Sequence, residues 1–147
     1  MILLGYRSDV RIITSKKGYD ELKKYVDTYL KKRDISYNLL DDCDVFKYND
    51  KECYFGWNSV KWYDHSEGYE DVTAIEEGIE HLEEKDFSYR MSILGEDYDD
   101  YEERYHNGKE KNYLSDVPFC RYFDDEEINY CSEKEPVNSS PELEVAA

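Results

Sequence analysis

Long apolar runs are missing from this chain of 147 residues. No stretch approaches the ~20 consecutive apolar residues that a membrane-spanning helix requires, so we expect no membrane partner. Met1–Leu4 is too short for the hydrophobic core of a secretory signal, and the charged Arg7 and Asp9 follow at once. These absences together predict a cytoplasmic protein.

The sequence motifs of common catalytic and metal sites are missing as well. The cysteines form no C-x-x-C pair and have no clustered histidines beside them, so the spacing of a zinc site is absent. The seven glycines are scattered, which excludes a nucleotide-binding loop, and neither G-x-S-x-G nor H-E-x-x-H occurs. We therefore expect no cofactor, no resident metal ion, no catalytic residue and four reduced thiols. The cysteines are Cys43, Cys53, Cys120 and Cys131.

Aliphatic residues are scarce, and aromatic residues take their place. Leu, Ile, Val and Phe number 31 of the 147 residues, close to the ~20% below which highly charged chains tend to stay disordered. Sixteen tyrosines and two tryptophans compensate, because each buries a large apolar face while its polar end stays hydrated. We expect one folded domain over 1–131 and a disordered acidic tail over 132–147. The alternative is a marginal fold that requires a partner.

Negative charge is abundant and lies mainly in the second part of the sequence. Nineteen Lys and Arg residues oppose 36 Asp and Glu residues, for a formal net charge of −17. Residues 1–60 are nearly neutral, whereas residues 61–147 carry 8 basic and 26 acidic side chains. Such a field repels phosphate backbones and attracts basic surfaces, although acidic residues also serve solubility alone. We expect no direct binding of nucleic acid and a protein partner with a basic surface, such as a nucleic-acid-binding enzyme.

Hydrophobic periodicity predicts alternating strands and helices up to residue 93. Alternation from Tyr6 to Thr14 indicates a half-buried strand, and Ser15 is positioned to cap the following helix. The expected elements are, in order, a strand over Leu3–Thr14, a helix of about 15 residues, a hairpin of Val45–Tyr48 with Glu52–Trp57, a helix over Tyr69–Lys85 and a strand over Phe87–Ile93. This β-α-β-β-α-β order predicts an α+β fold of ferredoxin-like type, with two helices on an antiparallel sheet. The same order admits other α+β arrangements.

From about residue 95 the sequence becomes an acidic, tyrosine-rich extension. Asn107 and Gly108 form a strong hairpin-turn dipeptide, which predicts a C-terminal β-hairpin between Tyr101–His106 and Lys109–Leu114. Val117–Phe123 is compatible with one more strand.

The second predicted helix carries a group of glutamates away from its apolar stripe. Residues three and four apart lie ~4.5 and ~6 Å apart along a helix axis, and phosphates advance ~3.4 Å per base along a DNA strand. Like charges four apart weaken a helix slightly, so a row of them favours an anionic binding surface over selection for stability. The alternative is an ordinary solvated helix face. These candidates are Glu76, Glu77, Glu80, Glu83 and Glu84.

A second candidate surface is the run of acids and tyrosines just after Gly95. Tyrosine anchors many protein interfaces, and the surrounding acids steer and orient a basic partner. The alternative is that the tyrosines complete a core that is poor in Leu and Ile. Three carboxylates, Asp97, Asp99 and Glu102, could instead gather Mg²⁺ or Ca²⁺ in a metal-dependent hydrolase. The candidate binding residues are Asp97, Tyr98, Asp99, Asp100, Tyr101, Glu102 and Glu103.

In its small size, acidity and runs of acids with tyrosine, the second half of the chain resembles the small phage-encoded inhibitors that mimic DNA, such as many anti-CRISPR proteins. The resemblance implies stoichiometric inhibition of a defence nuclease or another DNA-binding protein in the host cytoplasm. It rests on composition over the second half and transfers no individual residue. A third reading is an adaptor or homo-oligomer that uses exposed aromatic residues around Trp57 and Trp62.

Overall fold

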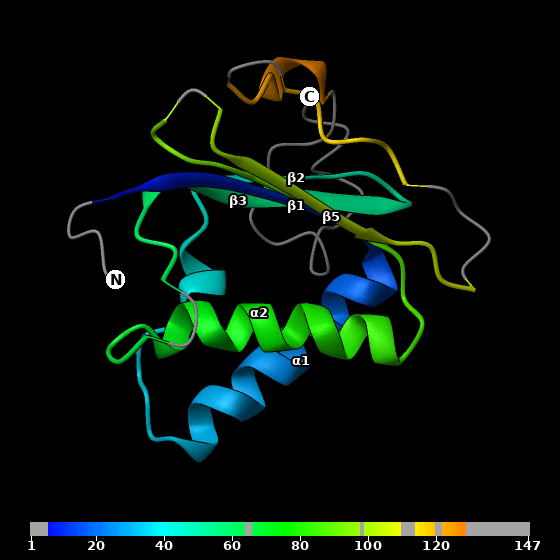
Figure 1. Ribbon diagram of the computed structural model, residues 1–147. Coiled ribbons are helices and arrows are strands. Elements are labelled where there is room, and N and C mark those ends of the chain that lie inside the picture. The colour runs from blue at the N-terminus through cyan, green and yellow to red at the C-terminus, as the bar shows by residue number, and fades with distance from the viewer. Residues whose placement is uncertain (1–5, 64–65, 98, 110–113, 120–121, 129–147) are drawn as a thin grey trace, which may run out of the picture.

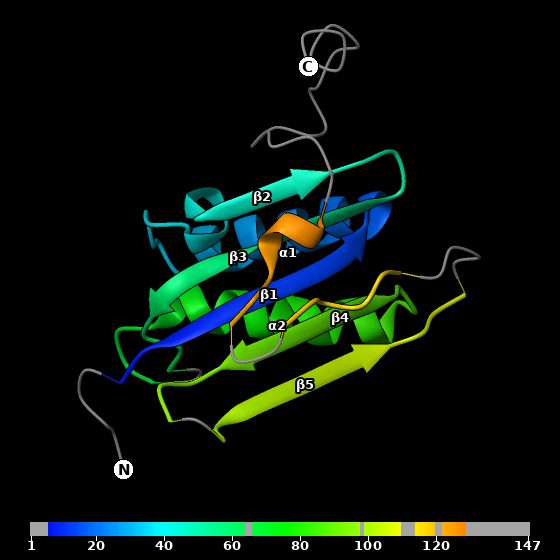
Figure 2. The same ribbon diagram turned by 90° about the horizontal axis from the view of Figure 1, so that it is seen from above.

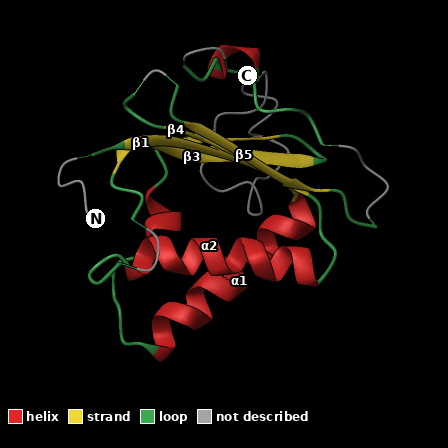
Figure 3. Cartoon of the chain, in the orientation of Figure 1, coloured by secondary structure: helices red, strands yellow, loops and turns green. Residues whose placement is uncertain are grey.

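Five β-strands form a sheet, and two α-helices pack on one face of it (Figures 1 and 3). The computed structural model of the chain describes residues 6–63, 66–97, 99–109, 114–119 and 122–128. The strands are β1 (Ser8–Ser15), β2 (Val45–Tyr48), β3 (Glu52–Val60), β4 (Tyr89–Leu94) and β5 (Tyr101–His106). The helices are α1 (Lys16–Lys32) and α2 (Glu70–Glu84), with short 3-10 turns at Leu39–Asp42 (η1) and Asp125–Glu127 (η2). The predicted α+β class is confirmed.

The sheet has the order β2-β3-β1-β4-β5, and neighbouring strands are antiparallel throughout (Figure 2). The predicted ferredoxin-like arrangement is matched only in part, because a fifth strand extends the sheet beside β4. The predicted C-terminal hairpin is wrong in its pairing. Tyr101–His106 is a strand, but it pairs with β4, which immediately precedes it in the chain. Lys109 and Leu114 of the expected second arm are not in a strand, and residues 110–113 lie outside the described residues.

The first helix begins where the sequence predicts it. The Ser15 hydroxyl accepts a hydrogen bond from the Gly18 N–H at 2.9 Å and so caps α1. The two helices approach closely because Gly78 of α2 has no side chain. A Cβ atom at that position would lie 2.5 Å from Leu22 Cδ1 of α1. Both helices therefore cover the sheet as one layer, and the main core lies between that layer and the sheet.

The opposite face of the sheet is crossed by an irregular segment that we call the C-terminal strap, residues 114–119 and 122–128 (Figures 1 and 2). Ile13, Tyr54 and Leu94 of the sheet form a second core with it. The strap contributes Leu114, Val117, Phe123 and Ile128 to this core. Because both faces of the central strands are covered, β1 is buried at almost every position.

Several predictions for the strap and the tail are settled only in part or lie outside the described residues. The described residues of Val117–Phe123 form no strand, and only an isolated bridge joins Phe119 to Phe123. The predicted domain boundary at residue 131 and the tail over 132–147 lie outside the described part of the chain. Among the described residues, no helix has the length and apolar character needed to cross a membrane.

Candidate partner-binding site

The run of acids and tyrosines lies on the β4–β5 connection and on β5, at one edge of the sheet (Figure 2). We call the described residues 96, 97 and 99–105 the acidic edge. Tyr101, Glu102 and Glu103 are exposed, with 57% of the Tyr101 surface accessible. Asp97, Asp99 and Asp100 of the connection are exposed too. Tyr98 lies outside the described residues. The structure thus brings most of the second predicted set together at one edge of the sheet.

Strand alternation divides β5 into two faces. Arg104 faces the helical layer, where its guanidinium contacts Glu76 of α2. Tyr101 faces the strap, with its ring centroid 6.1 Å from that of Phe119. Because successive side chains of a strand point to opposite sides, Glu103 and Tyr105 share the face of Tyr101. This face therefore presents a tyrosine, a glutamate and a tyrosine, and 66% of the Tyr105 surface is exposed.

The connection that leads into β5 is tied to the start of β1. The Tyr6 hydroxyl donates a hydrogen bond to the Asp100 carboxylate, and this bond raises the pKa of Tyr6. The Arg7 N–H donates to the Glu96 carboxylate. A Cβ atom at Gly95 would overlap the Asp100 carboxylate and the Tyr6 hydroxyl, so a larger residue there would displace this hydrogen-bonded pair. Two acids of the connection, Glu96 and Asp100, are therefore held by residues distant in the sequence.

The glutamates of α2 do not form the uniform exposed row that the sequence suggested. Glu80, Glu83 and Glu84 are exposed, and Glu77 is half-buried with its carboxylate accepting a hydrogen bond from Tyr25. The prediction is wrong for Glu76, because only 6% of its surface is exposed. A buried glutamate cannot be presented to a partner as a phosphate mimic.

Glu76 is buried because two distant side chains neutralise and hydrogen-bond it. Both Arg104 Nη atoms donate to its carboxylate at 2.7 Å, and Trp62 Nε1 donates at 2.7 Å as well. Such a bidentate pair is a strong, geometrically specific interaction. Arg104 Nε also lies 2.7 Å from a Glu102 oxygen, in an ion pair without hydrogen-bond geometry. Helical periodicity could not predict this pairing, because Arg104 lies on β5.

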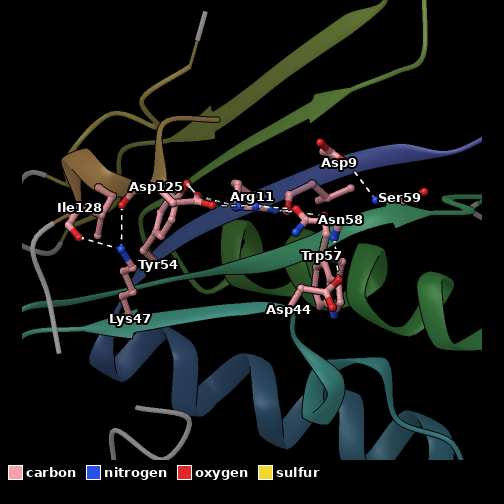
Figure 4. A network of polar contacts seen from close by, with 11 residues as sticks. Asp9, Arg11, Asp44, Lys47, Tyr54, Trp57, Asn58, Ser59, Asp125 and Ile128 are labelled. Carbon is pink, nitrogen blue, oxygen red and sulfur yellow. Dashed lines mark hydrogen bonds and ion pairs between the residues drawn. The ribbon is translucent and has the colours of Figure 1, made fainter. Parts of the chain in front are cut away.

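A buried polar network fastens the strap to the sheet (Figure 4). Arg11 of β1 has only 2% of its surface exposed, and its Nε and Nη2 atoms each lie 3.1 Å from an Asp125 carboxylate oxygen. The Tyr54 hydroxyl donates to the same carboxylate at 2.6 Å. Arg11 Nη2 also donates to Asn58 Oδ1 at 2.6 Å, and Lys47 Nζ donates to the Asp125 carbonyl at 2.7 Å. Three strands of the sheet thus contact Asp125 of the strap: β1 and β3 through its carboxylate, and β2 through its carbonyl.

Burial and hydrogen bonding in this network shift the pKa values of Asp125 and Tyr54. Burial raises the pKa of Asp125, but hydrogen bonds from Arg11 and Tyr54 outweigh that effect, and the net result is a lowered pKa. Burial, followed by the hydrogen bond to Asp125, raises the pKa of Tyr54. Asp125 is therefore a carboxylate and Tyr54 a neutral donor at neutral pH. Sequence reasoning missed this network, because Asp125 stands in an acidic run with nothing to distinguish it.

Comparison of the chain with protein-family models, curated proteins and solved structures finds no match. The candidate site therefore rests on its own geometry.

The residues of the two rival readings are arranged differently from what those readings require. Trp57 has 1% of its surface exposed, and its indole donates to the Leu39 carbonyl at 2.9 Å. Trp62 is partly buried against Trp57, with ring centroids 5.3 Å apart. Trp57 is therefore not exposed as the adaptor reading expects, and Trp62 is exposed only in part. Within the described residues, no three or more His, Cys, Asp or Glu side chains gather as a metal ion would require, and these residues include Asp97, Asp99 and Glu102.

Proposed function

We propose that this protein is an acidic binding protein that occupies the basic, nucleic-acid-binding surface of a partner protein and inhibits that partner stoichiometrically, as a DNA mimic of the anti-CRISPR type does. One observation carries the proposal. On one face of β5, Tyr101 and Tyr105 are exposed on either side of the exposed Glu103, and neither tyrosine belongs to the two cores. Exposed tyrosines among acids provide an anchor and a steering field on one surface.

Solubility alone accounts for the acids but not for the tyrosines. A chain with few aliphatic residues gains most by burying its aromatic side chains, and Tyr19, Tyr54 and Tyr89 are indeed buried. The exposed tyrosines Tyr37, Tyr101, Tyr105 and Tyr122 are exceptions to this use, and Tyr101 and Tyr105 share one face of β5, with 57% and 66% of their surfaces exposed. Tyrosine is enriched at protein interfaces because it supplies a large contact area at a low entropic cost. A partner that covered β5 would bury both rings.

The charge of the surface favours a cationic partner. The net charge of −17 attracts basic surfaces over a Debye length of ~8 Å at physiological ionic strength. Asp100 and Glu96 are held by Tyr6 and Arg7. A carboxylate that is already positioned loses less conformational entropy when it meets an arginine or lysine of the partner. The exposed glutamates of α2, Glu80 and Glu84, extend the field along the helical layer.

We also propose a ferredoxin-like core for the fold itself. In this reading β2-β3-β1-β4 and the two helices form the core, and β5 is an addition at its edge. In this reading β5, which carries the proposed binding residues, is an additional strand on the ferredoxin-like core. The proposed site of action is the cytoplasm, and the host cytoplasm if a phage encodes the protein.

The test begins with a partner captured from host extract by the full chain and then purified. The partner is loaded with labelled duplex DNA, and increasing amounts of the protein are added at several salt concentrations. We expect the DNA to be released at about one equivalent of protein, with association that slows as salt rises. The protein alone should leave the DNA unshifted.

Two charge-reversed variants make the test specific. Glu102→Lys with Glu103→Lys alters the acidic edge, and Glu126→Lys with Glu127→Lys makes the same charge change on exposed residues of η2. We expect the first variant to associate at least about tenfold more slowly and the second to change little, with circular dichroism as the folding control. Equal losses would assign the binding to overall charge, and affinity that is independent of salt would refute the DNA-mimic proposal.

A further inference from the structure

We propose that the outer edge of β5 accepts an extended, basic segment of the partner as a sixth, antiparallel strand. The inference rests on the proposed function, because it specifies how the same surface holds its partner. β5 is the last strand in the sheet order β2-β3-β1-β4-β5, and it lies at the margin of the sheet in Figure 2. No described segment pairs with its outer side.

The backbone of β5 supplies the hydrogen-bonding groups for such a strand. The Gly95 N–H donates to the Asp100 carbonyl at 2.7 Å, so these two residues form a hydrogen-bonded pair. Hydrogen-bonded and non-bonded pairs alternate along an antiparallel ladder. The Leu94–Tyr101 pair is consequently non-bonded, as is every second pair after it. The N–H and C=O groups of Tyr101, Glu103 and Tyr105 therefore point away from β4, toward the open edge.

This edge lacks most of the features that prevent strand addition. The register of β4 with β5 runs without a shift from Leu94–Tyr101 to Tyr89–His106, so no bulge twists the edge away. The strand contains no proline. Its glutamates could serve as protective charges, but protection gives no reason for exposed tyrosines on either side of Glu103. The combination fits an edge that excludes other strands and admits a strand of opposite charge.

Charge selects a basic segment over a second copy of the chain. Two copies would bring together two bodies of net charge −17, and their mutual repulsion opposes association. In the two-fold pairing centred on Glu103, the two Glu103 side chains would lie directly opposite each other, and like charges in that position are destabilising. A lysine or arginine opposite Glu103 reverses the sign of that interaction.

The two faces of β5 define the pattern that the partner strand would carry. Residues directly opposite in an antiparallel pair share a face, and aromatic residues pair favourably with β-branched ones. We therefore expect β-branched residues opposite Tyr105 and Tyr101, and a basic residue opposite Glu103. Glu102 favours a second basic residue on the other face. Read from its own N-terminus, the segment is Val-Thr-Lys-Arg-Val or a close equivalent.

The experiment uses the full chain and a fluorescein-labelled synthetic peptide with Val-Thr-Lys-Arg-Val at its centre and blocked ends. Binding is measured by fluorescence anisotropy, and hydrogen exchange reports the backbone amides of β5. We expect saturable binding that weakens at least about tenfold for Glu103→Lys, and slower exchange of the Glu103 and Tyr105 amides when the peptide is bound. These two amides belong to the groups that face the open edge.

Backbone methylation of the peptide separates strand addition from simple charge attraction. Opposite Glu103, the lysine N–H of the peptide would donate to β5, whereas the N–H of the neighbouring arginine would point away. Methylation of the backbone nitrogen of this lysine should weaken binding about tenfold, since it removes a ladder hydrogen bond. Methylation of the backbone nitrogen of the arginine leaves the charge and the ladder hydrogen bonds in place, so it should change binding less than about threefold.

The results distinguish this inference from the function on which it rests. Equal effects of the two methyl groups, or no change in exchange at β5, would overturn strand addition and leave an acidic surface that binds by charge. Absence of peptide binding would overturn it too, and the DNA-release assay would still decide the proposed function. Protection of β5 that rises with protein concentration without peptide would instead identify a second copy as the occupant.

Discussion

Removal of the Asp125 carboxylate tests what holds the strap to the sheet. In Asp125→Ala, the guanidinium of Arg11 stays buried with 2% of its surface exposed, but it loses the anion that it contacts through two atoms at 3.1 Å. Tyr54 loses its acceptor at 2.6 Å in the same step. The variant therefore leaves a buried cation and a buried hydroxyl without their shared partner.

The size of the effect follows from the burial of the two charges. Removing one partner of a fully buried ion pair costs about 3–5 kcal/mol. The Asp125 side chain is 28% exposed, and Arg11 keeps the Val10 and Trp57 carbonyls and Asn58 as acceptors, which places the loss near the lower end. We expect the free energy of unfolding to fall by about 3 kcal/mol. For a chain of this size, such a loss lowers the melting temperature by roughly 10 °C.

Urea unfolding, monitored by tryptophan fluorescence, measures this loss of stability. Glu126→Ala is the matched control. Glu126 lies in the same turn and is exposed, so its removal makes the same charge change without breaking the network. We expect the control to stay within about 0.5 kcal/mol of the parent protein. If Asp125→Ala cost no more than Glu126→Ala, the network would not be what fastens the strap.

Three further perturbations follow from the same structure. Gly78→Ala places a Cβ atom 2.5 Å from Leu22 Cδ1, so we expect a loss of about 1–3 kcal/mol in urea unfolding, where an unobstructed helical site would gain about 1 kcal/mol. Glu76→Gln removes the charge that Arg104 contacts, and we expect calorimetry to report a loss of about 2–4 kcal/mol; an unchanged melting temperature would contradict the buried pair. The lowered pKa of Asp125 adds stability above the ordinary value of ~3.9, and this contribution is lost as pH falls through the folded-state value. The stability difference between the parent and Asp125→Ala should therefore be full at pH 7 and shrink below about pH 4; a difference that is constant with pH would contradict the assigned role of the charge.

Local patterns predicted the elements up to β4 because each depends on nearby residues. The Ser15 cap and the spacing of Leu22 and Val26 are local to α1. The alternation of Val10 and Ile12 identified β1 but marked only one of its two buried faces. Such periodicity is written within a few residues. It therefore identifies a strand or helix without knowledge of its neighbours.

The partners of charged residues could not be read in the same way. Arg11 and Glu76 are charged residues that sequence rules assign to the surface, yet each is buried by a partner 114 or 28 residues away. The hairpin dipeptide at Asn107 and Gly108 predicted a partner for β5 on its C-terminal side, whereas β4 pairs with it. Buried ion pairs of this kind form only when the tertiary fold brings the two charged residues together. Within the candidate site, the acidic edge was predictable from composition. The burial of Glu76 was not predictable, because it depends on Arg104 of another element.

The contact between Arg11 and Asp125 has a consequence for the order of folding during synthesis. Arg11 of the first strand contacts a carboxylate 114 positions later in the chain, and domains generally fold as units during synthesis. In a sheet that formed before the strap was synthesised, Ile13, Tyr54 and Leu94 would lack the residues that cover them. An apolar face exposed in this way would favour contact with other nascent chains, and the many negative charges of this chain would oppose such contact.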